Sequence, residues 1–393
     1  MVNATQRLRG HGSRARRGLL IAALLALPLL IAACGPPAAG RWDDMTNNAS
    51  LPVFALAQDP SNLNLVYAGG GGGVIYRVLA SRTQVPVPGS GIPSSVVVLA
   101  LAADPNTAGN VYAGGTGGLF FSSHYGDTWQ STTNSGFPAG DSIDALIALP
   151  ISRMLLAGTT QHGVYLSTDA GGIWQAANTG LPSAANINCF FADAAAHVLY
   201  VSVDGAGVYA SRDNGATWTP RGAGLPPHTY ALAQVTSGGL NASGPTLYAA
   251  TNSGLYASSD GGVRWSAAST PGLPAGKLGS LAGDARAPTT LYAGAGNAVY
   301  RSSDGGRTWA VVAPGLARAP TQLVAVSGQL KQPVIFAAAG DLYRFPPPPG
   351  TTGSAGSVVL NVLILAALAT VAIFFLLRSR RLLADMDRRN RSE

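Results

Sequence analysis

The chain has 393 residues, of which 47% are apolar and only 11% are charged, and it contains 50 glycines and 26 prolines. So little charge beside so many aliphatic side chains excludes a disordered polar chain, and this much glycine without a collagen-like period fits a β-rich fold with many tight turns. The net charge of +7 comes from the two ends, because residues 41–346 carry 14 Lys and Arg against 15 Asp. This middle part has no basic cluster, so we expect no nucleic-acid partner.

Residues 1–34 have the pattern of an export signal. Five arginines precede the apolar run LLIAALLALPLLIAAC at residues 19–34, which is too short for a comfortable membrane span. The end of this run resembles a bacterial lipobox, so Cys34 is the predicted lipidation site. An uncleaved signal anchor is the alternative. Residues 35–40 follow as a linker.

Seven similar units follow between residues 41 and 346. Cores of the type VYAG or LYAG begin at residues 66, 111, 155, 199, 247, 291 and 335. The apolar runs around each core are short and are bounded by Gly, Pro, Asn or Asp, which is typical of strands. A period of about 45 residues with four strands has the size of one propeller blade. The sequence therefore predicts an all-β, seven-bladed β-propeller with about 45 residues per blade.

The two ends of this region complement each other. Trp42 begins a segment that looks like the fourth strand of a blade with no strands before it, while residues 341–345 look like a third strand with no fourth after it. We therefore expect residues 41–47 to complete the last blade, which removes the unpaired edge that an open array exposes.

An octapeptide of the pattern S-x-D-x-G-x-x-W recurs between the third and fourth strands of the units. In a tight turn the Asp can accept backbone N–H groups, the Gly can adopt a positive φ, and the Trp can bury its ring. One carboxylate per turn is too few for Ca²⁺, so we expect no metal and no cofactor. The residues to which we assign this structural role are Ser167, Asp169, Gly171, Trp174, Ser211, Asp213, Gly215, Trp218, Ser258, Asp260, Gly262, Trp265, Ser302, Asp304, Gly306 and Trp309.

This octapeptide resembles the BNR or Asp-box repeat family. The copy SSHYGDTW at residues 122–129 departs from the pattern, because His124 replaces the Asp, and the first unit shows no copy. Propellers of the family include sortilin-like receptors, sialidases, xyloglucan-cleaving glucanases and the photosystem II assembly factor. The resemblance implies that ligands bind on the rim opposite the octapeptides or in the central channel.

The turns between the second and third strands lie on that opposite rim, and they carry few polar side chains. A solvated turn residue is the alternative explanation at each position. The candidates for ligand contact are His162, Asp204, Asn252, Asn297 and Asp341.

Few residues of the sequence support a catalytic function, although an enzyme stays an open alternative. Glu393 is the only glutamate, so the glutamate base of a sialidase is missing from residues 41–346. A glycoside hydrolase of the inverting type needs two carboxylates ~6.5–9.5 Å apart. Asp141 and Asp144 enter one first strand, but their odd separation predicts that they point to opposite sheet faces.

The C-terminal part predicts a membrane anchor. Residues 347–357 form a linker, and residues 358–377 form a 20-residue apolar run. At ~1.5 Å per residue such a run spans a hydrocarbon core of ~30 Å as a helix. The Arg-rich residues 378–393 then form a cytoplasmic tail by the positive-inside rule.

The sequence as a whole favours a noncatalytic, membrane-anchored, monomeric propeller on the extracytoplasmic side that binds a protein or a glycan. Two alternatives stay open. The resemblance to the photosystem II factor implies an assembly or stability factor for a membrane protein complex, and the resemblance to glucanases implies a glycoside hydrolase of Asp-box type.

Overall fold

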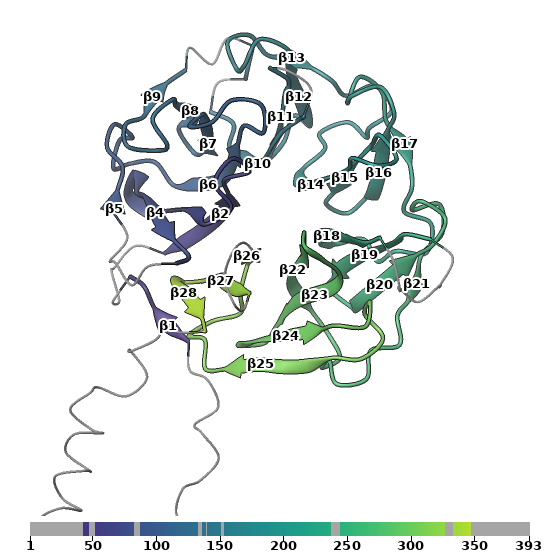
Figure 1. Cartoon of the computed structure of the whole chain (residues 1–393). Coiled ribbons are helices and arrows are strands. Elements are labelled where there is room, and N and C mark those ends of the chain that lie inside the picture. Colours follow the sequence, from purple (N-terminus) through teal and green to yellow (C-terminus); the bar gives the residue numbers. More distant parts are fainter. Residues whose placement is uncertain are drawn as a thin grey trace, which may run out of the picture.

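The computed structural model describes residues 42–46, 52–81, 87–132, 136–138, 140–150, 153–236, 244–326 and 333–346. These residues form seven four-stranded antiparallel sheets, which are arranged as a ring and follow one another in chain order (Figure 1). The predicted seven-bladed β-propeller is confirmed. The predicted export signal, Cys34, the two linkers, the spanning helix and the basic tail lie outside the described residues. Within the described ranges, no helix is long and apolar enough to cross a membrane.

The first four blades have the following strands. Blade 1 contains β2 (Val53–Gln58), β3 (Leu65–Gly70), β4 (Ile75–Leu79) and β5 (Val87–Pro88), with the 3₁₀ turn η1 (Gly71–Gly73) between β3 and β4. Blade 2 contains β6 (Val98–Ala103), β7 (Val111–Gly115), β8 (Gly118–Ser122) and β9 (Gln130–Ser131). Blade 3 contains β10 (Ile143–Ala148), β11 (Leu155–Thr159), β12 (Val164–Ser167) and β13 (Gln175–Ala176). Blade 4 contains β14 (Ile187–Asp193), β15 (Val198–Val203), β16 (Gly207–Ser211) and β17 (Thr219–Pro220).

The last three blades complete the ring. Blade 5 contains β18 (Thr229–Val235), β19 (Thr246–Thr251), β20 (Gly254–Ser258) and β21 (Ser266–Ala267). Blade 6 contains β22 (Leu278–Asp284), β23 (Ala287–Ala295), β24 (Ala298–Ser302) and β25 (Ala310–Pro314). Blade 7 contains β26 (Gln322–Val326), β27 (Val334–Ala339), β28 (Asp341–Phe345) and β1 (Asp43–Asp44).

The second strand of each blade is the core of the fold. Every residue of β3, β7, β11, β15, β19 and β27 is buried, because neighbouring blades cover both faces of the sheet. Small residues allow these blades to approach closely. A β-carbon on Gly69 would lie 2.6 Å from Cγ1 of Val98 in the next blade, and one on Gly114 would lie 2.5 Å from Cγ2 of Ile143. The VYAG cores are therefore contacts between blades as well as strands within them.

The ring closes in blade 7, where the two ends of the described chain share one sheet. Strand β1 pairs with β28, with Asp43 opposite Arg344 and Asp44 opposite Tyr343. The Trp42 indole N–H donates to the carbonyl of Ala313 in blade 6 at 2.9 Å, which fixes this segment to the neighbouring blade. This is the expected closure, and it leaves no unpaired ring edge among the described strands.

The octapeptide turns join the third and fourth strands of blades 2 to 6, and in each of them the first serine accepts the N–H of the glycine four residues later. In blade 6 the Ser302 hydroxyl donates to Asp304 at 2.7 Å and accepts the Gly306 N–H at 2.8 Å. Asp304 also accepts the Thr308 N–H at 3.0 Å, and the Trp309 indole donates to the Gly306 carbonyl at 3.0 Å. Gly306 has a φ of 87°, which a residue with a β-carbon adopts only with strain. These contacts are those of a structural turn. We call this side of the ring the octapeptide rim.

Candidate functional site

A cavity of about 510 Å³ lies at the centre of the ring. The first strand of all seven blades lines it, including Phe54 of β2, Asp144 of β10 and Tyr230 of β18. These first strands form the inner wall of the ring in Figure 1. Each first strand starts at the rim opposite the octapeptides, beside the turns between second and third strands. We call this side the mouth rim.

A β-bulge at the second residue of the first strand aims side chains into this cavity. In blades 1 to 6 the pairing of the first and second strands skips one residue at this position. A bulge leaves its extra residue outside the ladder and bends the strand, which redirects the side chain. Five of the six skipped residues line the cavity, namely Phe54, Asp144, Asn188, Tyr230 and Gly279, and the sixth is Leu99.

Asp144 is the one carboxylate among the residues that line this cavity. Its Oδ2 accepts the Thr160 hydroxyl at 3.2 Å, while its Oδ1 is buried and has no hydrogen-bond partner among the described residues. Burial raises the pKa of this carboxyl, and the neighbouring charge of Asp141 raises it further, against the lowering effect of the Thr160 hydrogen bond. Asp144 therefore holds, at the cavity wall, an acceptor oxygen whose hydrogen-bonding capacity the described residues leave unused.

Two His–Asp pairs stand on the mouth rim, and each joins a turn to the entrance of a first strand. His162 Nδ1 lies 2.8 Å from Oδ2 of Asp141, whose side chain is only 5% exposed, while the His162 side chain is 51% exposed. His228 Nδ1 lies 2.7 Å from Oδ1 of Asp204 in the preceding blade. Both imidazoles are thus held in place by a carboxylate and remain open to solvent.

The second pair continues into the cavity. The Asn188 amide donates to Asp204 at 3.3 Å and to the Thr229 carbonyl at 3.0 Å. Burial raises the pKa of Asp204, but the hydrogen bonds from His228 and Asn188 outweigh it and hold that pKa below its ordinary value. A line of polar groups therefore runs from His228 on the rim to Asn188 on the cavity wall.

The remaining predicted residues stand on the same rim in other blades. Asn252 and Asn297 are exposed turn residues of blades 5 and 6. Asp341 opens β28 in blade 7, where burial and the charge of Asp44 raise its pKa. The five candidates therefore stand in five successive blades, and only Asp204 is joined by its side-chain contacts to a residue that lines the cavity.

Lys277 and Tyr230 form a further pair at the mouth. The Lys277 ammonium lies 4.4 Å from the centre of the Tyr230 ring, and both residues line the cavity. A cation over an aromatic face is attracted by the ring quadrupole. Cys189 lies on the cavity wall, where burial raises the pKa of its thiol to about 12 and so disfavours the thiolate form that a nucleophile needs.

The expectation for Asp141 and Asp144 assumed a regular strand alternation, which the bulge interrupts. Asp141 precedes β10 and is held by His162, and the skipped pairing at Asp144 breaks the alternation on which the expectation rested. The two carboxyls are close enough for the charge of Asp141 to raise the pKa of Asp144. Among the described residues, no three His, Cys, Asp or Glu side chains come together in a way that could hold a metal ion.

Sequence reasoning missed Asn188, Tyr230, Lys277 and His228, and it weighed Asp141 and Asp144 only as a catalytic pair, not as a partner of His162 and a cavity residue. One signal was available: the connection into a first strand and the turn after a second strand meet at the same rim. This rule places Asp141 beside His162 and His228 beside Asp204. The bulges had no comparable signal, because they interrupt the two-residue alternation of a strand.

The comparisons with known proteins concern the fold. The family model for the DUF6242 beta propeller domain matches residues 152–286, about a third of the chain. No curated protein sequence matches the chain significantly.

Three solved structures resemble the chain at low identity. The GH74 xyloglucanase from Xanthomonas campestris gives a TM-score of 0.56 at 20% identity, over 78% of this chain and 53% of the enzyme. YCF48 from Cyanidioschyzon merolae gives a TM-score of 0.58 at 14% identity, over 78% of this chain and 98% of YCF48. YCF48 bound to D1 peptide gives 0.57 at 14% identity, over 79% and 96%. The chain thus spans about half the xyloglucanase and nearly all of YCF48, and these likenesses, with the family model, identify it as a β-propeller.

Proposed function

We propose that this chain is a noncatalytic, monomeric, membrane-anchored propeller on the extracytoplasmic side, which binds a protein or glycan at the mouth of the central cavity. The observation that carries the proposal is Asp144, the one carboxylate among the residues that line the cavity, whose buried Oδ1 has no hydrogen-bond partner among the described residues. A buried acceptor without a donor is costly, and a ligand that donates a hydrogen bond to it removes that cost.

The lining chemistry supports a ligand with hydroxyl or amide donors. Tyr230 and Phe54 offer aromatic faces, and Asn188 offers an amide beside the Asp144 carboxylate. Sugar hydroxyls and peptide N–H groups both suit such a combination of a few placed polar groups in a mostly apolar cavity. The predicted rim candidates, His162, Asp204, Asn252, Asn297 and Asp341, would then contact the part of the ligand that stays outside.

The membrane attachment rests on the apolar residues 358–377 and on Cys34, which anchor the propeller beside other membrane proteins. This position suits the assembly-factor alternative as well, in which the ligand is a subunit of a membrane complex. Binding of a peptide is known for a propeller of the same fold, YCF48, which has been solved with D1 peptide.

A glycoside hydrolase is the second candidate, because one observation favours it. The raised pKa of Asp144 next to Asp141 is the arrangement in which one carboxyl acts as an acid and the other as a base. Against this role, Asp141 is almost fully buried and is already held by His162. The noncatalytic function therefore agrees better with the geometry.

The test uses the full chain in detergent, applied to a glycan array and used as bait for solubilised membranes. Asp144→Asn and Tyr230→Ala should each weaken capture about tenfold or more, as expected for a contact at the centre of a binding site. Tyr125→Ala is the matched control, because Tyr125 is 41% exposed on the octapeptide rim, and it should bind as the unmodified chain does.

The outcomes separate the candidates. Retention on the array supports a glycan ligand, and one stoichiometric membrane partner supports the assembly factor. Hydrolysis of a polysaccharide that Asp144→Asn or Asp141→Asn abolishes supports the enzyme and overturns the noncatalytic proposal. Capture that neither cavity variant weakens shows that the ligand does not bind at the mouth.

A further inference from the structure

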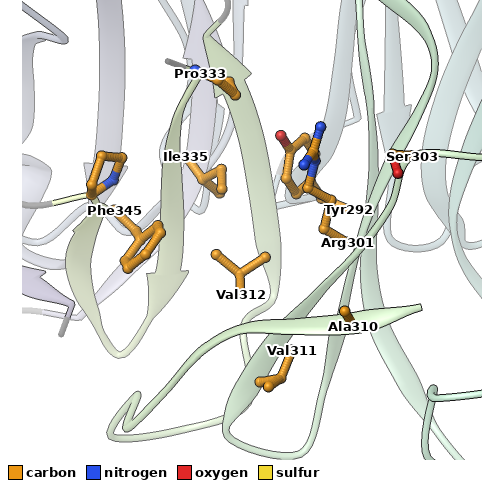
Figure 2. A pocket seen from close by; sticks show the side chains of 10 residues that line it. Tyr292, Arg301, Ser303, Ala310, Val311, Val312, Pro333, Ile335 and Phe345 are labelled. Atoms are coloured by element: carbon orange, nitrogen blue, oxygen red, sulfur yellow. The ribbon is translucent and has the colours of Figure 1, made fainter. Parts of the chain in front are cut away.

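A second cavity, of about 410 Å³, lies on the octapeptide rim between blades 6 and 7 (Figure 2). Val312, Ile335 and Phe345 form apolar walls, and the Tyr292 ring and the Arg301 guanidinium lie side by side at one edge. Phe345 ends β28, and Arg301 lies one residue before the octapeptide that starts at Ser302. This cavity is therefore on the rim opposite the mouth, and it plays no part in the function proposed above.

Where the following blade carries an octapeptide, its turn fills this position. The Tyr248 hydroxyl of blade 5 donates to the Gly305 carbonyl in the turn of blade 6 at 2.6 Å. The Tyr200 hydroxyl of blade 4 donates to the Gly261 carbonyl of blade 5 at 3.3 Å. A β-carbon on Gly126 of blade 2 would lie 3.2 Å from the Tyr67 ring of blade 1. The second-strand tyrosines of blades 1, 4 and 5 thus pack on the turn of the following blade.

Blade 7 offers no such turn to blade 6. Its third strand β28 and its fourth strand β1 come from opposite ends of the chain, so no octapeptide joins them. Tyr292 is the tyrosine of blade 6 at the repeated position, and its buried hydroxyl has no hydrogen-bond partner among the described residues, whereas Tyr200 and Tyr248 donate to a turn carbonyl of the next blade. The cavity stands where the missing turn would be.

Three arginines share one register position in the third strands, opposite the aromatic residue of the second strand. Arg77 is opposite Tyr67, Arg301 is opposite Tyr292, and Arg344 is opposite Phe336. Arg77 forms an ion pair with Asp127 in the octapeptide of blade 2. Arg344 donates to the Ala80 carbonyl of blade 1 at 2.6 Å. Both arginines therefore cross to the next blade.

Arg301 is exposed and has no ion pair within the described part of the chain. Asp284 of the same blade acts on Tyr292 electrostatically, as Asp59 does on Tyr67 in blade 1. Blade 1 thus has its own aspartate and a second one from the next blade, while blade 6 has only its own. Among the described residues, no carboxylate at this cavity pairs with Arg301 as Asp127 pairs with Arg77.

We propose that this cavity binds an acidic turn segment of a partner protein, which takes the place of the missing octapeptide. The segment's carboxylate pairs with Arg301, as Asp127 pairs with Arg77. Its backbone approaches the Tyr292 edge, and its apolar part packs against Val312, Ile335 and Phe345. A charge-assisted pair beside an apolar wall gives both the orientation and the burial that a peptide site needs.

The test measures fluorescence anisotropy of a labelled peptide with the sequence of residues 122–129, SSHYGDTW, added to the full chain in detergent. We expect Arg301→Gln to weaken binding about tenfold, because a hydrogen-bonded charge pair is lost. The change Asp127→Asn within the peptide should weaken binding equally, and the two changes together should do no more than either alone.

Arg77→Gln in the chain is the matched control, since Arg77 has the same register position and is already paired in the ring. It should leave peptide affinity unchanged, and far-UV circular dichroism checks that every variant is folded. Peptide binding that ignores Arg301→Gln, or no binding to the full chain, overturns the proposal. If the peptide does not bind but the chain elutes as a dimer that Arg301→Gln dissociates, the occupant is a second copy of the chain.

Discussion

The two rims of the ring are built differently. On the octapeptide rim the same residues return at the same positions, so that Ser167, Ser211, Ser258 and Ser302 each accept the N–H of the glycine four residues later. On the mouth rim the bulge position holds a different residue in each of the six bulged blades, from Phe54 to Gly279. Residues that repeat serve the contacts that every blade needs, whereas a ligand meets the ring once. The comparison teaches that recognition lies in the residues that break the repeat.

The largest expected effect is the loss of a repeated aromatic side chain. Trp309→Ala should lower the free energy of unfolding by about 3–5 kcal/mol, because it removes a buried ring and its hydrogen bond to Gly306. Urea unfolding measures the change. Val311→Ala, two residues away and 52% exposed, is the control and should stay within about 0.5 kcal/mol. If the two variants lowered the free energy of unfolding equally, the octapeptide tryptophan would not be the source of the stabilisation.

A smaller effect is expected for the repeated serine. Ser302→Ala removes the acceptor of the buried Gly306 N–H, which should cost about 1–3 kcal/mol of unfolding free energy. On the mouth rim, Asn297→Ala changes an exposed side chain and should cost less than about 0.5 kcal/mol. The same urea experiment compares them. A cost for Asn297→Ala as large as that for Ser302→Ala would contradict the division between the rims.

The octapeptide aspartate Asp304 should make the free energy of unfolding depend on pH, with stability lost at low pH. Burial raises the pKa of Asp304, but hydrogen bonds from Thr308, Ser302 and the backbone outweigh it and lower that pKa from its ordinary 3.8 to about 2. The stabilisation is therefore present above pH 3.8 and is lost as the pH falls toward 2. Because Asp304 is partly exposed, Asp304→Asn should cost only about 1 kcal/mol at pH 7. Unfolding between pH 7 and pH 2 should show this difference shrinking, and a difference independent of pH would exclude the mechanism.

Asp144 on the mouth rim should give the smallest effect and the opposite sign. Its pKa lies above the ordinary 3.8 because of burial and of Asp141, so folding becomes less favourable as the pH rises from 3.8 through the folded pKa. Asp144→Asn should therefore raise the stability at pH 7, by less than about 1 kcal/mol, and the gain should vanish below pH 3.8. A loss of stability at pH 7 would show that the carboxylate serves the fold rather than a ligand.

The sequence predicts the repeated half of this molecule well. The phase of the cores gives seven blades, and the lone segment at Trp42 gives the closing strand, because both follow from what every blade must share. The site is harder to predict because it depends on exceptions. Asp144 and Tyr230 reach the cavity through bulges that leave no trace in the alternation of apolar and polar residues. His162 and Asp204 were recognisable as rim residues, while their partners Asp141 and His228 follow only once the connections are placed in space.

The closing strand has a mechanical consequence. Trp42 and Pro346 leave the pair β1–β28 at the same end, because Asp43 is opposite Arg344 in an antiparallel ladder. Tension between the two ends of the propeller therefore loads the backbone hydrogen bonds one after another, as in opening a zipper, instead of all at once in shear. The short β1, Asp43–Asp44, is the first part of the ring to yield to such a pull. A chain held at both ends would thus open at blade 7, beside the cavity of Arg301, while its other six blades remain intact.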